Sequence, residues 1–290
     1  MLRPKSNNIP SKGYLENSYQ KKMRINRSNE ISKYFYPILL IIAEICGVLS
    51  VILVALFYPA TGRYGYYDWK TNPFSYHPLM MTIGLVFCYG NGIILYRTFP
   101  KVSKYPVKLC HAFLLISSFV FAAVGLSAII RSKELSKGSH FLTYHSWIGL
   151  TTLILFVLQW ICGFVSFLFP QLSLEIRQLY MPRLTSLSFE KKQTSMKSFD
   201  FSHRFWGKTI FLCAMISVVT GLSEYGMRTS FFTANDEQRS RRLTMNFFAV
   251  FTSLFSLIIL YLLSNRDYQR PTEISEDTTQ HPSRPVTVEY

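Results

Sequence analysis

The chain has 290 residues and a net charge of +15, with 49% hydrophobic, 16% aromatic and only 16% charged residues. The apolar residues are gathered in long blocks that leave little sequence for a soluble domain, which excludes an ordinary soluble enzyme. In a soluble protein this charge would indicate nucleic-acid binding, but beside membrane spans it is explained by topology and anionic lipid headgroups. The expected partner is therefore the lipid bilayer, and no nucleic acid is expected.

Six apolar blocks are each long enough to cross a membrane, since about 20 apolar residues span a hydrocarbon core of about 30 Å. In chain order they cover residues 37–57, 77–97, 109–130, 144–169, 203–224 and 244–264. The first block lies too far from the N-terminus for a cleaved signal peptide. The predicted fold is an all-α polytopic membrane protein with six transmembrane helices. The predicted domains are a disordered basic tail at 1–36, a transmembrane domain at 37–264 and a disordered tail at 265–290.

Lysine and arginine residues are distributed unequally between the two sides of these spans. With six spans, both tails and the second and fourth loops lie on one side and carry 20 of them, while the other three loops carry nine. Because Lys and Arg are retained on the cytoplasmic side during insertion, both termini are predicted to be cytoplasmic. The sequence does not distinguish an endomembrane, such as the endoplasmic reticulum or a vesicle, from the plasma membrane.

Four of the six histidines lie at the start of predicted spans. His77, His111, His145 and His203 open the second, third, fourth and fifth spans, respectively. Successive spans run in opposite directions, so His77 and His145 share the outer half of the membrane, and His111 and His203 share the cytoplasmic half. A single histidine here often caps a helix end or contacts headgroups. Ionisable groups at membrane depth are nevertheless costly and usually functional, so two matched pairs indicate a shared ligand.

A six-coordinate haem iron satisfies this pattern, because its two axial positions accept neutral imidazoles from opposite directions between facing helices. One haem in each half of the membrane would make an electron path across the bilayer. The chain contains no C-x-x-C-H motif, so the haems would be non-covalent haem b. The prediction is two bis-histidine haems in a central four-helix bundle of spans two to five, with no catalytic residues beyond the ligands.

Four segments resemble the cytochrome b561 family in their order and spacing. They are YHPLMMTIGLVFCYGNGIILYRTFP, KLCHAFLL, YHSWIGLTTLILFVLQWICGFVSFLFP and HRFWGKTIFLCAMISVVTGLSE. Motifs such as H-P-x-x-M and H-S-W-x-G are weak alone but specific together, and the resemblance covers residues 37–264. The loop KELSKGSHFLTYHSW is most similar to the D-type branch, a stand-alone transmembrane ascorbate-dependent reductase. The resemblance implies two b-type haems with the same histidine pairing.

The resemblance also implies substrates. Electrons would pass from cytoplasmic ascorbate through the haems to an acceptor on the opposite face, either a ferric chelate or monodehydroascorbate. Lys104 and Lys108 resemble positions that bind ascorbate, and a cationic cluster there, which includes Arg97, would attract an anion. Lys137 and His140 match a loop that flanks the acceptor site. These lysines also fit the role of ordinary membrane anchors, and His140 that of a solvated loop residue.

Three other classes of protein fit parts of the pattern. A histidine-lined proton or metal-ion transporter would use the same histidines without haem. A flavocytochrome ferric reductase also holds two haems, but its histidines are paired on the same helices and it carries FAD and NADPH domains. A structural membrane protein would need none of the four histidines. The sequence does not decide the acceptor, the haem potentials or whether the chain forms a homodimer.

Overall fold

The computed structural model describes residues 12–57, 67–168, 189–228 and 236–269. These ranges are helical, and the one bridge of β type within them joins Asp68 to Asn72. Six helical stretches are long and apolar enough to cross a membrane: Tyr34–Phe57, Pro73–Thr98, Lys104–Leu135, Tyr144–Phe167, Asp200–Gly226 and Ser240–Ser264. The predicted all-α fold with six spans is confirmed.

The helices are taken here in chain order. The first is α1 (Lys12–Phe57). The second span consists of η2 (Pro73–Ser75), α2 (Tyr76–Met81), the π-helical segment η3 (Thr82–Cys88) and α3 (Tyr89–Thr98). The later spans are α4 (Lys104–Leu135), α5 (Tyr144–Gly163) with the π-helical segment η4 (Phe164–Leu168), α8 (Phe189–Arg228) and α9 (Asp236–Ser264), and a short 3₁₀ turn, η6 (Arg266–Tyr268), follows.

Helix α1 is longer than its span. It begins at Lys12, so it extends into residues 12–36, which the sequence predicted as part of a disordered tail. The stretch from Tyr14 to Tyr36 contains neither Pro nor Gly to interrupt it, and the helix is continuous with the apolar span across Pro37. Residues 1–11 and 270–290 of the predicted tails lie outside the described ranges, and the division into domains stays a prediction.

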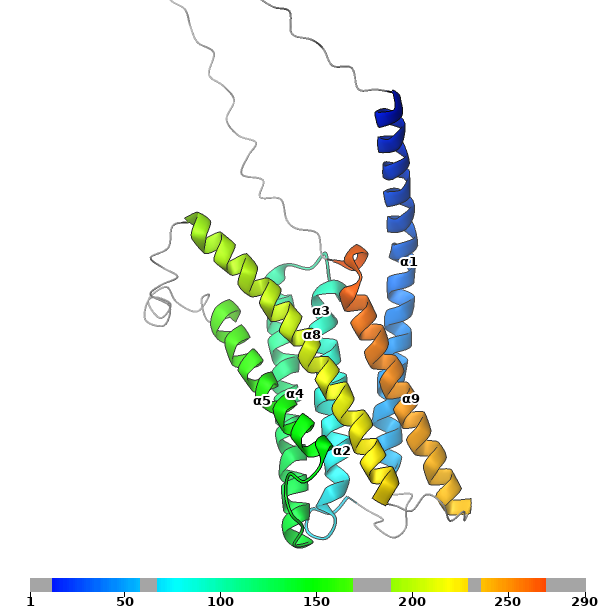
Figure 1. The fold of residues 1–290 in the computed structure, drawn as a ribbon, viewed down its shortest axis with the longest axis vertical. Coiled ribbons are helices and arrows are strands. Elements are labelled where there is room, and N and C mark those ends of the chain that lie inside the picture. Colours follow the sequence, from blue (N-terminus) through cyan, green and yellow to red (C-terminus); the bar gives the residue numbers. More distant parts are fainter. Residues whose placement is uncertain (1–11, 58–66, 169–188, 229–235, 270–290) are drawn as a thin grey trace, which may run out of the picture.

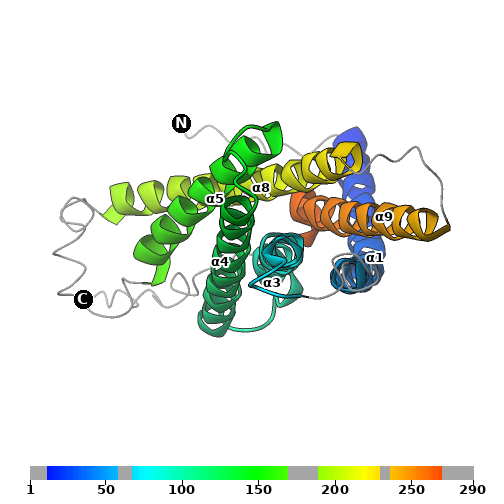
Figure 2. The same cartoon turned by 90° about the horizontal axis from the view of Figure 1, so that it is seen from below.

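The spans pack in pairs. Helix α1 lies along α9, the second span along α4, and α5 along α8. Figure 1 shows α1 and α9 side by side, in blue and orange. Seen from the end of the bundle, α3 lies between α4 on one side and the α1–α9 pair on the other (Figure 2). Spans two to five therefore form the central bundle, and α1 and α9 flank it.

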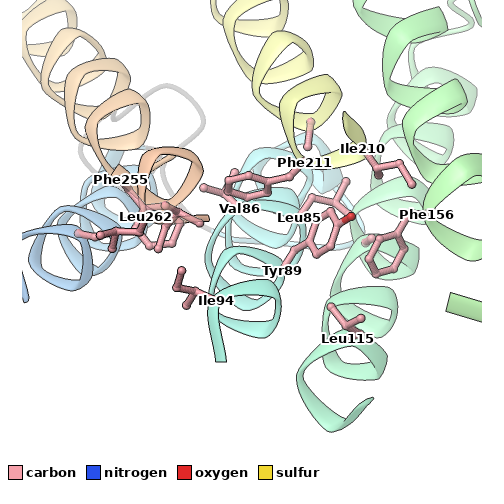
Figure 3. Packing of buried hydrophobic residues seen from close by; sticks show 14 of the residues in the cluster. Leu85, Val86, Tyr89, Ile94, Leu115, Phe156, Ile210, Phe211, Phe255 and Leu262 are labelled. Atoms are coloured by element: carbon pink, nitrogen blue, oxygen red, sulfur yellow. The ribbon is translucent and has the colours of Figure 1, made fainter. Parts of the chain in front are cut away.

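An aromatic cluster holds α5 and α8 against the second span. Tyr89 meets Phe156 and Phe211 edge to face, with ring centroids 4.9 and 5.5 Å apart, respectively. Figure 3 shows these rings converging from three helices. The Tyr89 side chain is buried, and its hydroxyl donates to the carbonyl of Gly207 at 2.8 Å. Because this buried hydroxyl is satisfied, the cluster stabilises the bundle without an unpaired polar group.

The second span also makes close contacts with its other neighbours. The Ser118 hydroxyl of α4 donates to the carbonyl of Gly84 at 2.8 Å, within the π-helical segment. Arg97 donates to three carbonyls at the end of α9, with 2.6 Å to that of Leu263. A cation there satisfies the last carbonyls of a helix. Arg97, which the sequence assigned to the cationic cluster, therefore joins the second span to α9.

Candidate functional site

The four histidines occupy the central bundle as two pairs. His77 and His145 lie one residue inside α2 and α5, whereas His111 and His203 lie further inside α4 and α8, which begin earlier than predicted. All four are half-buried. The rings of His77 and His145 lie close together, and we refer to these residues as the first pair. His111 and His203 lie within electrostatic range of each other and form the second pair.

Main-chain carbonyls hold both rings of the first pair. The Nδ1–H of His77 donates to the carbonyl of Gly125 on α4, and that of His145 donates to the carbonyl of Ser217 on α8, each at 2.9 Å. The ring centroids are 6.0 Å apart with an interplanar angle of 86°. A carbonyl can only accept, so each Nδ1 carries the proton and each Nε2 has a free lone pair. The first pair therefore presents two metal-ligating nitrogens.

The second pair is held differently on its two sides. The Nδ1–H of His111 donates to the carbonyl of Gly92 at 2.7 Å, again a main-chain acceptor. Nδ1 of His203 instead faces the side-chain amide of Gln159, whose nitrogen lies 2.9 Å away and also donates to the His203 carbonyl at 2.7 Å. In this arrangement Nδ1 of His203 accepts. Binding of iron through Nε2 of His203 would require Gln159 to turn its oxygen toward a protonated Nδ1.

Glycines give the histidine rings their space. A Cβ atom at Gly221 would lie 2.9 Å from Cε1 of His145, and one at Gly163 would lie 2.7 Å from Cε1 of His203. Real Cβ contacts are almost never this short, so any side chain at these positions would displace the ring. Both glycines belong to the helix that runs beside the histidine they contact.

The contacts follow a reciprocal pattern. The second span and α4 run antiparallel, and each provides one histidine and one glycine. The carbonyl of the glycine on one helix accepts from the histidine on the opposite helix. In the pair formed by α5 and α8, each helix contributes a histidine and the glycine that packs on the other's ring. Glycines within spans are usually explained by close helix packing alone, so none of these four is conspicuous by itself. The equal spacing from His145 to Gly163 and from His203 to Gly221 was the available signal.

A cavity of about 370 Å³ surrounds the first pair and is lined by residues from all six spans. His140, which the sequence predicted to belong to an acceptor site, lines this cavity, and its role there stays a prediction. Lys137 does not line it, so the structure does not place this predicted residue beside His140 in the cavity. Lys133, one helical turn earlier, lines the cavity instead, and the sequence did not single it out.

Two residues of the loop beside this cavity have a left-handed backbone. Lys137 and Phe141 adopt φ values of 51° and 54°, and they are the non-glycine residues with positive φ in the described ranges. This conformation costs a non-glycine residue roughly 1–2 kcal/mol. The N–H of Lys137 donates to the carbonyl of Glu134 at 3.2 Å and that of Gly138 to the carbonyl of Lys133 at 2.9 Å, the pattern of a Schellman cap. The left-handed Lys137 therefore terminates α4.

At the other end of the bundle, predicted cations lie near the second pair. The amine of Lys108 donates to the carbonyl of Phe167 at 3.1 Å, and the Phe167 ring lies edge to face with His203, at a centroid distance of 5.3 Å. Lys104 opens α4 one turn earlier and is exposed. The two lysines are close enough to interact electrostatically. This end of the bundle therefore combines a histidine pair with positive charge.

Comparisons with known proteins agree with this architecture. The family model described as eukaryotic cytochrome b561 matches residues 76–189. The transmembrane ascorbate-dependent reductase CYB561 of Bos taurus is 31% identical over 236 residues, which are 79% of this chain and 84% of the relative. A putative transmembrane ascorbate-dependent reductase CYB561 homolog of Caenorhabditis elegans is 29% identical over 269 residues, 89% and 93% of the two chains.

A third relative extends the comparison to another membrane. The lysosomal membrane ascorbate-dependent ferrireductase CYB561A3 of Danio rerio is 29% identical over 247 residues, 82% of this chain and 92% of the relative. These matches do not assign the chain to the D-type branch, which stays a prediction. They extend over most of each relative and include the segments that hold the histidine pairs. The chain belongs to the cytochrome b561 family, in its stand-alone form.

Proposed function

We propose that the protein carries electrons across a membrane through two non-covalent haems b, one held by the first pair and one by the second. The observation that carries the proposal is that three of the four rings have Nδ1–H bound to a main-chain carbonyl, which leaves Nε2 for iron. Membership of the cytochrome b561 family supports haem b as the cofactor. When bound, each haem would supply a one-electron iron centre.

The first pair has the residues to hold an iron. His77 and His145 come from facing helices, and their ring centroids lie 6.0 Å apart, so both imidazoles could serve one metal centre. The first pair supplies two imidazole ligands, which suits a haem because its macrocycle provides the other ligands of the iron.

We assign the electron donor, ascorbate, to the second pair. The names of the relatives describe ascorbate-dependent reductases, and ascorbate is an anion at neutral pH. The positive charges of Lys104 and Lys108 would raise the local concentration of an anion near His203. Phe167 contacts both groups, since its carbonyl accepts from the Lys108 amine and its ring packs against His203. The unequal distribution of Lys and Arg supports a cytoplasmic location for this end and for both termini.

We assign the electron acceptor to the first pair and its cavity. The zebrafish relative is named a ferrireductase, which supports a ferric chelate, and monodehydroascorbate is the second candidate. His140 lines the cavity and can donate a hydrogen bond to an oxyanion. The lysosomal relative supports an endomembrane location, and the plasma membrane is the alternative.

The decisive experiment is haem analysis of the purified protein. Acid-acetone extraction should recover about two haems per chain, and ascorbate should produce the absorbance bands of reduced haem b. Clearly fewer than two haems would contradict the proposed cofactor content. A protein without haem that moves protons or metal ions in proteoliposomes would support the transporter alternative instead.

A further inference from the structure

Two lysines near the end of α4 have different surroundings. Lys133 is half-buried and lines the cavity around the first pair, together with His140. Lys137 is exposed and does not line the cavity, although it lies only four residues further on. Because α4 ends at Leu135, the chain leaves the helical path between the two positions. Lys133 is therefore the one of these two cations that faces the cavity.

The Lys133 side chain lies beside Gly138. A Cβ atom at Gly138 would lie 3.2 Å from the Ser136 hydroxyl oxygen, 3.3 Å from Cδ of Lys133 and 3.9 Å from its amine, so the lysine packs over the glycine. The N–H of Gly138 also donates to the Lys133 carbonyl at 2.9 Å. A side chain at position 138 would press on the lysine without removing its charge.

The surroundings of Lys133 suit a negatively charged oxygen group. The hydroxyl-bearing Ser136 and Ser139 line the same cavity, as does His140. The Ser136 hydroxyl already donates to the Lys133 carbonyl at 3.2 Å, so the donors for a carboxylate are the Lys133 ammonium, the Ser139 hydroxyl and an imidazole N–H. Ser139 and His140 lie between Lys137 and Phe141, the two residues with positive φ. Glu224 of α8 also lines the cavity. Its carboxylate would repel a bound anion, so anion binding there requires a cation such as Lys133.

We propose that Lys133, with Ser139 and His140, binds a carboxylate at the mouth of the cavity and thereby favours anionic electron acceptors. This inference rests on the proposed function. The carboxylate can belong to a soluble acceptor, such as a ferric chelate, or to a propionate of the haem held by the first pair. The competing explanation is that Lys133 only stabilises the C-terminal end of α4 through its charge.

The test compares Lys133→Gln with Lys137→Gln as the matched control, in proteoliposomes of known orientation. The haems are first reduced with ascorbate, and re-oxidation is then followed with ferric citrate, an anionic probe, or with hexaammineruthenium(III), a cationic probe. The midpoint potential of the first-pair haem is measured on the same samples. For a soluble acceptor, Lys133→Gln should raise the half-saturating ferric citrate concentration about tenfold and spare the cationic probe. For a haem propionate, it should shift the midpoint potential instead.

In either case Lys137→Gln should behave like the parent protein, and Gly138→Ala should reproduce part of the Lys133→Gln effect. Equal effects of the two lysine variants, or parent-like values for Lys133→Gln in both measurements, would overturn the inference. The parent protein provides the separate check on the proposed function. Two haems and reduction by ascorbate in the parent, with no Lys133 effect, would reject only the carboxylate site. A parent protein without haem would reject the proposed function itself.

Discussion

The two histidine pairs are positioned by different kinds of group. In the first pair both rings bind main-chain carbonyls, those of Gly125 and Ser217, which the helices hold in fixed positions. In the second pair one ring binds the Gly92 carbonyl, whereas His203 faces the side chain of Gln159, which can rotate. Hydrogen bonds to a ligating histidine fix its tautomer and its basicity. The first pair is thus set by the backbone, and the second depends on one replaceable side chain.

The largest effect is expected from removing a ligand. His77→Ala or His145→Ala should abolish the haem of the first pair, and His111→Ala or His203→Ala that of the second, each leaving about one haem per chain. Haem extraction and absorbance spectra of the purified variants would measure this. His140→Ala serves as the histidine control that keeps both haems. The same spectral loss in His77→Ala and His111→Ala would disprove the pairing.

Filling the space beside a ring should have the next largest effect. Gly221→Ala should weaken haem binding at the first pair, and Gly163→Ala at the second, because the new Cβ atom would displace His145 or His203. Such overpacking costs about 1–3 kcal/mol, which corresponds to roughly 5- to 150-fold weaker haem binding. Haem titration of each variant would report it. Gly207→Ala is the control in α8, since the nearest atom lies 3.9 Å from the added carbon.

Changing Gln159 should affect the second pair alone. Gln159→Glu should lower the midpoint potential of its haem, because a carboxylate makes the His203 imidazole a stronger donor to the ferric iron. Gln159→Leu should loosen the ring and weaken haem binding by about tenfold. Redox titration with optical detection would separate the two haems. Ser217→Ala is the matched control, since it retains the main-chain carbonyl that binds His145, and a shift there as large as in Gln159→Glu would remove the contrast between the pairs.

Neutralising the two predicted donor-side lysines should have a smaller, kinetic effect. The double substitution Lys104→Gln and Lys108→Gln should slow haem reduction by ascorbate by about tenfold, because the charges of these lysines attract an anionic donor. The difference should shrink at high salt, where exposed charges are screened beyond a few ångströms, compared with about 8 Å at physiological ionic strength. Stopped-flow measurement in oriented proteoliposomes would separate reduction from re-oxidation. His140→Ala should slow only re-oxidation, and equal slowing of both steps by either variant would reject the assignment of sides.

The smallest effect is expected in the strained loop beside the first pair. Lys137→Gly should raise the stability of the protein by about 1 kcal/mol or less, because glycine adopts a φ of 51° without steric cost. Thermal unfolding of the detergent-solubilised protein would detect it. Lys133→Gly, which places glycine inside α4, should instead destabilise the protein. A lower melting temperature for Lys137→Gly would mean that the lysine side chain stabilises the loop.

The spans were predictable because their signal is hydrophobic length, and the start of α5 was predicted at the correct residue, Tyr144. The approximate location of the histidines followed from the same signal, since alternating helix directions bring His77 to the same end as His145. The cavity-lining lysine was not predictable in this way. The third span was expected to end at residue 130, which placed Lys133 and Lys137 together in a loop, whereas α4 continues to Leu135 and separates them.

The hydrogen-bond partner of His203 also could not be predicted from the sequence. Gln159 lies 44 residues earlier, within an apolar span, and only the packing of α5 along α8 brings its amide to the ring. The contacts of Arg97 with α9 were missed for a similar reason. A cation at the end of a span has the same appearance whether it faces solvent or, as here, binds the carbonyls of another helix.

The reciprocal contacts also bear on how the protein is made. Spans emerge from the ribosome in order. Until α8 has been made, the second pair lacks His203, and His145 of the first pair lacks the Ser217 carbonyl as an acceptor. The fifth span therefore completes both sites. We expect haem loading to be a late event in biosynthesis that is coupled to insertion of α8, so that a nascent chain arrested after α5 would hold neither cofactor firmly.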